Sequence, residues 1–383
     1  MTRLFLIAGE PSGDRLGAAL IDGLRLLVPD VEIYGIGGPE MEARGLQSLF
    51  PMSELSVMGL AEVLPRLRQL FRRRDEAAAA IAQLAPDALI TIDSPDFCLR
   101  VAARARRARP DLPVIHYVAP SVWAWRPERA RKMARNVDHV LALLPFEPDY
   151  MRAAGMSCDF VGHPVVADPI ATPAEAGRFR ERHGITGALA LLLPGSRKGE
   201  VERLSPVFGE ALQQIPRGTR VVVPTVPHVA PDVRAAVANW PGQPIIVTND
   251  SDKRAAFAAA TAALAASGTV SLELAANGVP MVIAYDMNWF SRRVLARMLK
   301  IDTVTLVNLV SRSRAVPEFL GDACRPGPVG RALADLLVVP SQRERQLVAL
   351  EETMEALGRG GPAPGLRAAR SVLRHLGWED VSE

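Results

Sequence analysis

The sequence contains few of the features typical of secreted, membrane-spanning or metal-binding proteins. Its only cysteines are Cys98, Cys158 and Cys324, which lie far apart and form no CxxC pair. Their number and spacing exclude a disulfide framework and a clustered zinc site, and they fit a reducing compartment. No apolar stretch approaches the roughly 18 residues that span a bilayer, and the first apolar run, residues 4–8, is too short for a signal peptide. We therefore expect a soluble or peripheral protein.

A strong excess of one charge is also lacking. The chain has 45 Lys and Arg against 42 Asp and Glu, a net charge of +3, and aromatic residues make up 5%. A nucleic-acid groove needs basic side chains interleaved with aromatic ones, so we expect no nucleic-acid partner. No GK[ST] sequence occurs, and the GIGG segment at 35–38 has Glu40 where a dinucleotide fingerprint needs its third glycine. Walker and dinucleotide-binding loops are therefore excluded.

The chain is long and apolar enough for two domains. It has 383 residues, of which 49% are hydrophobic and 23% are charged. Short apolar runs, each followed by a loop with Gly, Pro or Asp and then a helical pattern, predict strands at 4–8, 88–92, 114–118 and 140–144. This alternation is typical of a parallel sheet covered by helices.

The same pattern starts again after a proline-rich stretch at 162–173. The second set of predicted strands is 188–193, 220–223, 244–248, 262–266 and 281–285. We therefore predict an α/β protein of two doubly wound, Rossmann-like lobes that face a central cleft, with ligands at the carboxyl ends of the strands. The predicted domains are a first lobe at 1–165, a second lobe at 166–345 and a helical tail at 346–383.

Polar loops follow two predicted strands of the first lobe. Residues 9–14, GEPSGD, combine two glycines, which let the backbone approach a ligand, with Ser12 and Asp14, either of which can cap the next helix. Residues 93–97, DSPDF, place two carboxylates three positions apart at a strand end. One carboxylate can act as a general base beside an orienting partner, or both can simply cap the helix that follows.

A third loop, HYVAPSVWAW at 116–125, holds two of the five tryptophans. Trp123 can stack on a sugar face or shield an acyl chain, or it can pack locally beneath the loop. Its place after a predicted strand puts it at the same sheet edge as the other two loops.

Two loops of the second lobe favour a nucleotide diphosphate. Residues 193–197, LPGSR, bring the Arg197 guanidinium and a hydroxyl to the start of a helix. Residues 266–273, ASGTVSLE, place small hydroxyl side chains after a buried strand. Glu273 follows about one helical turn later, where it can accept two ribose hydroxyl protons or complement the helix dipole.

One segment near residue 65 combines apolar residues at helical spacing with interleaved arginines. Such a basic amphipathic helix either lies in an anionic membrane interface or packs its apolar face on the core. The apolar positions are Met58, Leu60, Val63, Leu64, Leu67, Leu70 and Phe71.

These loops, in this order, resemble those of the bacterial lipid-A-disaccharide synthases, a family of inverting glycosyltransferases with the two-lobed GT-B fold. The matching stretches are AGEPSGD (8–14), MGLAEVLPRL (58–67), DSPDF (93–97), YVAPSVWAWR (117–126), LLPFE (143–147), FVGHP (160–164), LLPGSR (192–197), ASGTVSLELA (266–275), NLV (308–310) and VPEFL (316–320). The resemblance spans residues 1–325, and the tail beyond carries little recognisable pattern.

The resemblance implies a specific reaction. The donor would be UDP-2,3-diacylglucosamine and the acceptor 2,3-diacylglucosamine 1-phosphate. The products would be the β(1→6)-linked disaccharide 1-phosphate of lipid A biosynthesis and UDP. The resemblance also implies that no metal or other cofactor is needed, and that the enzyme is cytoplasmic and peripheral at the cytoplasmic face of the inner membrane.

The resemblance also implies roles for residues. Asp96 is the first candidate for the base that deprotonates the attacking hydroxyl, with Asp93 as neighbour or substitute, and Arg197 would meet the charge on the leaving UDP. The expected donor-binding residues are Gly195, Ser196, Arg197, Ser267, Gly268, Thr269, Glu273 and Asn308. The expected acceptor-binding residues are Glu10, Ser12, Gly13, Asp14, Ser121 and Trp123. Acyl chains and membrane lipid would meet the segment 58–71.

Two other functions fit part of the pattern. A UDP-N-acetylglucosamine 2-epimerase-like isomerase shares the lobes and nucleotide loops, but its soluble substrate needs neither the basic amphipathic segment nor the tryptophan loop. A non-catalytic nucleotide-sugar-binding protein would be favoured if Asp93 and Asp96 both proved dispensable while UDP still bound. The tail is expected either to cross back to the first lobe or to be exchanged between partners in a homodimer.

Overall fold

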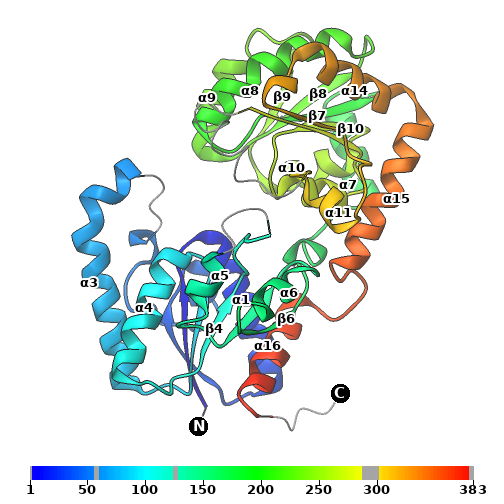
Figure 1. Cartoon of the computed structure of the whole chain (residues 1–383). Coiled ribbons are helices and arrows are strands. Elements are labelled where there is room, and N and C mark those ends of the chain that lie inside the picture. The colour runs from blue at the N-terminus through cyan, green and yellow to red at the C-terminus, as the bar shows by residue number, and fades with distance from the viewer. Residues whose placement is uncertain (1, 56–59, 124–127, 287–301, 379–383) are drawn as a thin grey trace. The chain divides into compact units, whose positions relative to one another are not determined.

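The computed structural model describes residues 2–55, 60–123, 128–286 and 302–378, without the side chains of 60–66. The chain divides into two compact units. Unit 1 consists of Met1–Pro164 and Gly360–Glu383, and unit 2 consists of Val165–Arg359. Each unit is a sheet with helices on its two faces (Figure 1). The expectation of two doubly wound α/β lobes is thereby confirmed.

Unit 1 contains a six-stranded sheet in the order β2-β1-β3-β4-β5-β6, and every pair of neighbours is parallel. The strands are β1 (Arg3–Ala8), β2 (Glu32–Ile36), β3 (Ala88–Ile92), β4 (Val114–Tyr117), β5 (His139–Ala142) and β6 (Ser157–Phe160). The helices are α1 (Pro11–Leu27), α2 (Pro39–Glu42), α3 (Leu60–Leu84), α4 (Pro95–Ala108), α5 (Glu128–Met133), α6 (Glu147–Arg152) and α16 (Pro364–His375). The chain leaves β1 for β2 on one side and returns to β3 on the other, so the strand order reverses between β1 and β3.

Unit 2 repeats this plan with the order β12-β11-β10-β7-β8-β9, again wholly parallel. The strands are β7 (Leu189–Leu193), β8 (Arg220–Pro224), β9 (Ile245–Val247), β10 (Ala262–Ala265), β11 (Met281–Tyr285) and β12 (Glu318–Leu320). The helices are α7 (Pro173–Arg182), α8 (Lys198–Ala211), α9 (Ala230–Val237), α10 (Asp250–Ala259), α11 (Val270–Ala276), α13 (Leu306–Val310), α14 (Pro326–Val338) and α15 (Pro340–Ala356). Here the order reverses between β7 and β10.

Proline opens many of these helices. Its fixed φ suits the first turn, and its missing N–H is no loss there because the first helical N–H groups have no partner within the helix. The helices α1, α2, α4, α7, α14, α15 and α16 all begin at a proline. The proline content of the sequence therefore marks where helices begin as well as where loops lie.

The helical tail divides between the two units. Gln346 of α15 is buried and pairs with the backbone of Met281, accepting from its N–H at 2.8 Å and donating to its C=O at 3.0 Å. This contact belongs to unit 2, and the chain returns to unit 1 at Gly360, within the expected tail of 346–383. Helix α16 then lies beside α1, with Ala368, Ala369 and Val372 in the unit 1 core (Figure 1).

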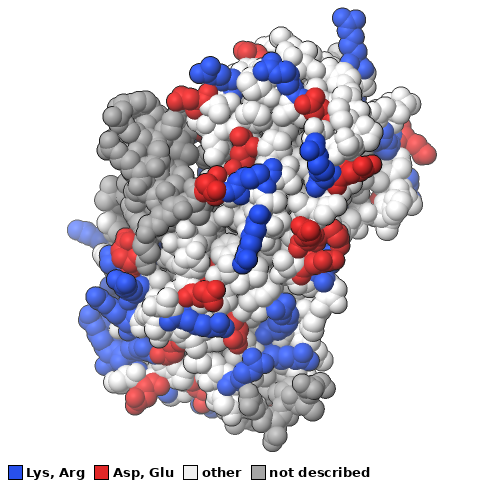
Figure 2. Space-filling model, turned by 45° about the vertical axis from the view of Figure 1, so that its right-hand side comes forward, with Lys and Arg blue, Asp and Glu red and all other residues white. Residues whose placement is uncertain are grey.

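The surface carries both charges. Figure 2 shows Lys and Arg side chains interspersed with Asp and Glu over the face in view, which agrees with the net charge of +3. In the described part of the chain, no helix is long and apolar enough to cross a membrane.

Candidate functional site

The loops that follow β7 and β10 meet at the carboxyl edge of the unit 2 sheet. Ligands of doubly wound sheets bind where the strand order reverses, and this is such a point. Together with the ends of β8 and β9, the two loops line a cavity of about 450 Å³. Seven residues expected to bind the donor line this cavity, namely Gly195, Ser196, Arg197, Ser267, Gly268, Thr269 and Glu273.

Glu200 shapes the loop after β7. Its Oε2 accepts the Ser196 N–H at 3.1 Å, and its Oε1 lies 3.2 Å from Arg197 Nη1. Gly195 has φ +124°, and a Cβ on it would lie 2.6 Å from Glu200 Oε2, so only glycine fits. Burial, with the Glu200 carboxylate beside it, raises the pKa of Tyr285. The loop thus presents the Ser196 and Arg197 side chains from a fixed backbone.

Glu273 does not stand alone in the cavity. Lys253 Nζ, which also lines the cavity, lies 2.7 Å from Glu273 Oε2. The sequence reasoning missed Lys253, because it lies 20 residues before Glu273 and belongs to no recognisable motif. The structure joins the two because α10 and α11 flank the same sheet edge.

Thr225, at the end of β8, supplies a further polar group. It lines the cavity, and its Oγ1 is buried without a hydrogen-bond partner among the described residues. Buried hydroxyl groups rarely lack a partner in a finished structure.

Asn308 differs from the other expected donor-binding residues. It is fully buried, and its Nδ2 donates to Val316 O at 2.9 Å while its Oδ1 accepts from Val316 N at 3.0 Å. Nδ2 also lies 3.3 Å from Thr303 Oγ1. The side chain therefore holds the 303–318 segment together, and Asn308 is not among the residues that line the 450 Å³ cavity.

The corresponding point of unit 1 lies between β1 and β3. There the 9–14 and 93–97 loops contact each other, since Ser12 Oγ donates to Asp93 Oδ2 at 3.3 Å. A Cβ on Gly9 would lie 2.6 Å from Ser94 Oγ, so glycine permits this close approach. Ser94 Oγ in turn lies 3.5 Å from Glu10 Oε1.

Backbone strain gathers at this edge. Asp93 has φ +53°, Ser94 has φ +41°, and Val118, after the neighbouring strand β4, has φ +89°. Each such conformation in a residue other than glycine costs about 1–3 kcal/mol, and such residues cluster at functional sites. The strain therefore marks the carboxyl edge of β3 and β4 as the candidate catalytic edge of unit 1.

The two candidate bases have different surroundings. Asp93 is partly buried, and its Oδ1 accepts the Ser94 N–H at 2.9 Å while its Oδ2 accepts from Ser12. Asp96 lies in the first turn of α4 and is exposed. Within the described part of the chain, no group donates a hydrogen bond to its carboxylate. Asp93 thus holds the loop, and Asp96 is open to a ligand.

Asp14 and Gly13 serve the fold and not the surface of this site. Asp14 is 2% exposed, and its carboxylate accepts the backbone N–H groups of Gly38, Glu40 and Met41 at 2.9–3.0 Å. It therefore caps α2, which leaves it unavailable to an acceptor sugar. Gly13 is buried, and a Cβ there would lie 3.2 Å from a β3 carbonyl oxygen.

Trp123 is anchored by a buried carboxylate. Its Nε1 donates to Glu147 Oε1 at 3.2 Å, and its ring meets Phe146 edge-on with centroids 5.3 Å apart. Glu147 Oε2 accepts the N–H groups of Leu143 and Leu144 at 3.1 and 2.9 Å. Burial raises the pKa of Glu147 to about 7 against the lowering effect of these hydrogen bonds. Ser121 is exposed, and residues 124–127 lie outside the described part of the chain.

The expected membrane segment is only partly described. Met58 lies outside the described residues, as do the side chains of Leu60, Val63 and Leu64. The remaining apolar positions belong to α3, where Leu67 and Leu70 are partly buried and Phe71 is 40% exposed. Further along α3, Ala77, Ala78 and Ile81 are buried on the unit 1 body.

Three of the described arginines of this helix, Arg68, Arg72 and Arg73, fall into two groups. Arg73 pairs with Glu54 at 2.6 Å and with Glu76 at 2.7 Å, so it fastens the helix to the unit. Arg68 and Arg72 are exposed to solvent. The second group is therefore available to an anionic surface.

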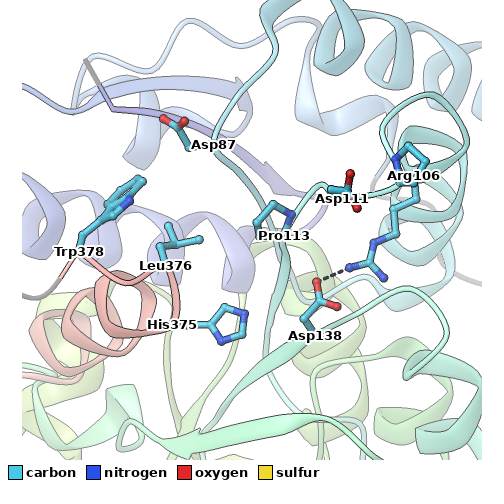
Figure 3. Close-up of a pocket in the computed structure, with 9 residues that line it drawn as sticks. Asp87, Arg106, Asp111, Pro113, Asp138, His375, Leu376 and Trp378 are labelled. Atoms are coloured by element: carbon cyan, nitrogen blue, oxygen red, sulfur yellow. Dashed lines mark hydrogen bonds and ion pairs between the residues drawn. The ribbon is translucent and has the colours of Figure 1, made fainter.

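A second cavity, of about 670 Å³, lies at the opposite edge of the unit 1 sheet. Figure 3 shows it between the end of α16, with His375 and Trp378, and the segments that precede β3, β4 and β5, with Asp87, Asp111 and Asp138. Arg106 pairs with Asp138 there. Because ligands of parallel sheets bind beyond the carboxyl ends of strands, this cavity is separate from the candidate site. Among the residues that the structure describes, no three His, Cys, Asp or Glu side chains gather as a metal site would require.

Known proteins resemble the chain over nearly its full length. Residues 4–361 match the family described as Lipid-A-disaccharide synthetase. The lipid-A-disaccharide synthase of Ruegeria pomeroyi is 58% identical over 98% of this chain and 96% of its own length. That of Rhodospirillum centenum is 50% identical over 97% of this chain and 94% of its own.

Solved structures resemble the fold. UDP-GlcNAc 2-epimerase from Neisseria meningitidis, bound to UDP-GlcNAc, has a TM-score of 0.63 at 11% identity, covering 99% of this chain and 100% of its own. HepE of Anabaena, in complex with UDP and glucose, has a TM-score of 0.61 at 14% identity with the same coverage. At these identities the likeness concerns the two-lobed fold.

Proposed function

The chain belongs to the lipid-A-disaccharide synthase family, and from this premise we propose that it joins two diacylated glucosamine units. It is a glycosyltransferase of the two-lobed GT-B type. The 6-hydroxyl of 2,3-diacylglucosamine 1-phosphate attacks C1 of UDP-2,3-diacylglucosamine, and the bond from C1 to the diphosphate breaks. The products are the β(1→6) disaccharide 1-phosphate and UDP, with inversion at C1. The epimerase-like alternative is not favoured, since the curated relatives at 58% and 50% identity are synthases.

The observation that carries the donor assignment is the unit 2 cavity at the point where the strand order reverses. We propose that the hydroxyls of Ser196, Ser267 and Thr269 bind the diphosphate together with the N–H groups of Ser267 and Thr269, with Arg197 beside them. Negative charge grows on the leaving UDP, and these donors, already fixed in place, stabilise it. Glu273 accepts the ribose hydroxyls.

The acceptor assignment rests on the strained edge of unit 1. We propose Asp96 as the base, because its exposed carboxylate can reach a hydroxyl proton while Asp93 is engaged with Ser12 and Ser94. Glu10 and Ser12 contribute to the acceptor side, and Trp123, held by Glu147, supplies an apolar face for sugar or acyl chain. The transferred proton moves from the 6-hydroxyl to Asp96 as the new bond forms.

Both substrates carry acyl chains, so the enzyme must take them from a lipid phase. We propose that the 58–71 segment makes this contact at the cytoplasmic face of the inner membrane. Phe71 is exposed on α3 beside Arg72, a combination suited to anionic lipid.

The decisive test is UDP release by the purified protein in detergent micelles containing UDP-2,3-diacylglucosamine, with and without the monophosphate acceptor. Acceptor-dependent release with a disaccharide product is expected for the wild type. Asp96→Asn should lower kcat about 100-fold or more while UDP binding is unchanged, because the loss of a general base affects the chemical step. Asp111→Asn, at the opposite edge of the same sheet, is the matched control and should be fully active.

Two results would contradict this proposal in different ways. If Asp96→Asn were fully active, the proposed reaction would stand but Asp96 would not be the general base, and Asp93→Asn would be tested next. A folded protein that binds UDP but releases none in the presence of acceptor would not be a synthase, and an epimerase assay would follow.

A further inference from the structure

We propose that Lys253 is a positioning residue for the donor, which holds the Glu273 carboxylate in the orientation that accepts the ribose hydroxyls. Lys253 would thereby make the enzyme selective for ribonucleotides. The inference rests on the proposed function, because it takes the unit 2 cavity as the nucleotide site.

Two contacts fix the Lys253 ammonium. Nζ lies 2.7 Å from Glu273 Oε2, and the two side chains are 36% and 35% exposed. Nζ also lies 5.5 Å from the ring centroid of Phe257, which follows one turn later on α10 and is buried. This distance is within the range of a cation–π interaction. Lys253 is therefore an anchor at the cavity wall and not a freely moving surface lysine.

A fixed carboxylate suits a pair of neighbouring hydroxyls. A partly exposed glutamate normally exchanges between rotamers, and ordering it costs conformational entropy when a ligand binds. An ionised carboxylate offers about four lone-pair positions. Lys253 occupies one of them on Oε2, which leaves Oε1 and the remaining position on Oε2 for a ligand. Ribose presents the 2′- and 3′-hydroxyls side by side, whereas 2′-deoxyribose presents only one of them.

A direct contact between Lys253 and the diphosphate is the competing explanation. The two roles differ in their dependence on Glu273. A phosphate contact would act whether or not Glu273 is ionised. A positioning role acts only through Glu273, so it disappears when that side chain is changed.

The test is a double-mutant cycle on the full-length protein. Isothermal titration calorimetry gives the Kd for UDP and for 2′-deoxy-UDP with the wild type, Lys253→Met, Glu273→Gln and the double variant. We expect Lys253→Met to weaken UDP binding about 10-fold and to bring the ratio of the two Kd values close to one. In the Glu273→Gln background the same change should alter the Kd less than about twofold.

Two further variants test whether the effect depends on the charge of Lys253 and on its place in the cavity. Lys253→Arg keeps the charge and the contact, so it should recover most of the preference for UDP. Lys198→Met is the control. Lys198, on α8, pairs with Glu202 and Asp232, and it is not among the residues that line the cavity. This variant should bind both nucleotides as the wild type does. In turnover, Lys253→Met should raise KM for the donor and leave kcat within about twofold, since the reacting atoms are untouched.

The outcomes separate the possibilities. Lys253→Met could raise the Kd for UDP equally in the wild-type and Glu273→Gln proteins while the preference for UDP over 2′-deoxy-UDP is kept. That result would assign Lys253 to the diphosphate and overturn the positioning role. If Lys253→Met bound UDP and 2′-deoxy-UDP with wild-type Kd values, the Lys253–Glu273 ion pair would have no role in binding and the proposal would be wrong. A wild-type protein that binds no UDP would overturn the proposed function itself.

Discussion

Glu147 shows how a single buried residue can link the fold to the site. Its side chain is 4% exposed, yet it holds three hydrogen-bond donors, two from the backbone of the 143–147 loop and one from Trp123. The 143–147 loop follows β5, and Trp123 follows β4. One carboxylate thereby ties together loops from two neighbouring strands at the edge where the acceptor is proposed to bind.

The raised pKa of Glu147 makes a prediction about pH. Its pKa is about 7 in the folded protein and 4.5 in its ordinary state, so the folded protein binds more protons between these values. Its contribution to stability is therefore complete below about pH 4.5 and is lost as the pH rises through about 7. Glu147→Gln removes this dependence. The free energy of unfolding can be measured by urea denaturation for the wild type and for Glu147→Gln. We expect the wild-type value minus the variant value to fall by up to roughly 3 kcal/mol from pH 5 to pH 8.

A second glutamate provides a control of opposite sign. Glu175 forms a capping box with Thr172 at the start of α7, and these hydrogen bonds lower its pKa. Its contribution is present at neutral pH and is lost as the pH falls. A Glu147→Gln difference that is constant with pH would contradict the assignment of the raised pKa to Glu147.

At the scale of elements, the sequence predicted the strands in the middle of both sheets. Strands buried on both faces read as continuous apolar runs, and β1, β3, β7 and β10 are such strands. The three strands that it missed, β2, β6 and β12, all lie at sheet edges and are partly exposed. Their sequences alternate too weakly to be separated from loops.

The candidate site was predictable to a similar degree. The LPGSR and ASGT loops do line one cavity, because the carboxyl ends of neighbouring parallel strands share an edge. Asp14 and Asn308 lie in motifs of the same family, yet their side chains form hydrogen bonds with backbone N–H and C=O groups instead of facing a ligand. Lys253 has no motif at all. Which polar residue of a motif faces a ligand depends on tertiary packing, and a single sequence does not contain that information.

Helix α3 makes a prediction that concerns one whole element. Its second half packs on unit 1, while Arg68, Phe71 and Arg72 remain exposed. We expect the protein to sediment with vesicles of phosphatidylethanolamine and phosphatidylglycerol more than with phosphatidylcholine alone. Each of Arg68→Gln and Arg72→Gln should weaken binding about fivefold, since a basic side chain near an anionic surface contributes about 1 kcal/mol.

The matched control for α3 is a residue of α1 in the same unit. Leu26 is 70% exposed, so Leu26→Ser removes a surface apolar side chain as Phe71→Ser does. Phe71→Ser should lower vesicle binding, and Leu26→Ser should not. Equal loss in both variants would mean that binding reflects general surface hydrophobicity, and the 58–71 segment would lose its assigned role.

At the scale of the whole molecule, the chain crosses between its units twice, and the second crossing completes unit 1. Ser371 of α16 donates to Asp159 Oδ2 at 2.7 Å, and its Oγ lies 2.8 Å from His139 Nε2. The His375 ring stacks on His139 with centroids 4.6 Å apart. Burial lowers the pKa of His139 to about 4, so its ring is neutral at physiological pH. Unit 1 thus depends on a helix that the chain reaches only after all of unit 2 has been made.

Close packing of α16 on α1 gives the last prediction. A Cβ on Gly365 would lie 2.7 Å from the Ala19 carbonyl carbon, whereas a Cβ on Gly177, in α7, would meet nothing within 4 Å. Gly→Ala normally stabilises a helix by about 0.5–1 kcal/mol, so Gly177→Ala should stabilise unit 2. Gly365→Ala should instead destabilise unit 1, because the backbones of α1 and α16 must separate.

Hydrogen exchange measured by mass spectrometry locates these effects. Gly365→Ala should speed exchange in α1 and α16 and leave α8 and α14 of unit 2 unchanged. Unchanged exchange in α1 would show that α16 does not pack there in solution. A homodimer that exchanges α16 stays a prediction. In such a dimer, α16 of one protomer would pack on α1 of its partner. Light scattering on Gly365→Ala separates the two arrangements, because only an exchanged helix would make the loss of this contact lower the molecular mass.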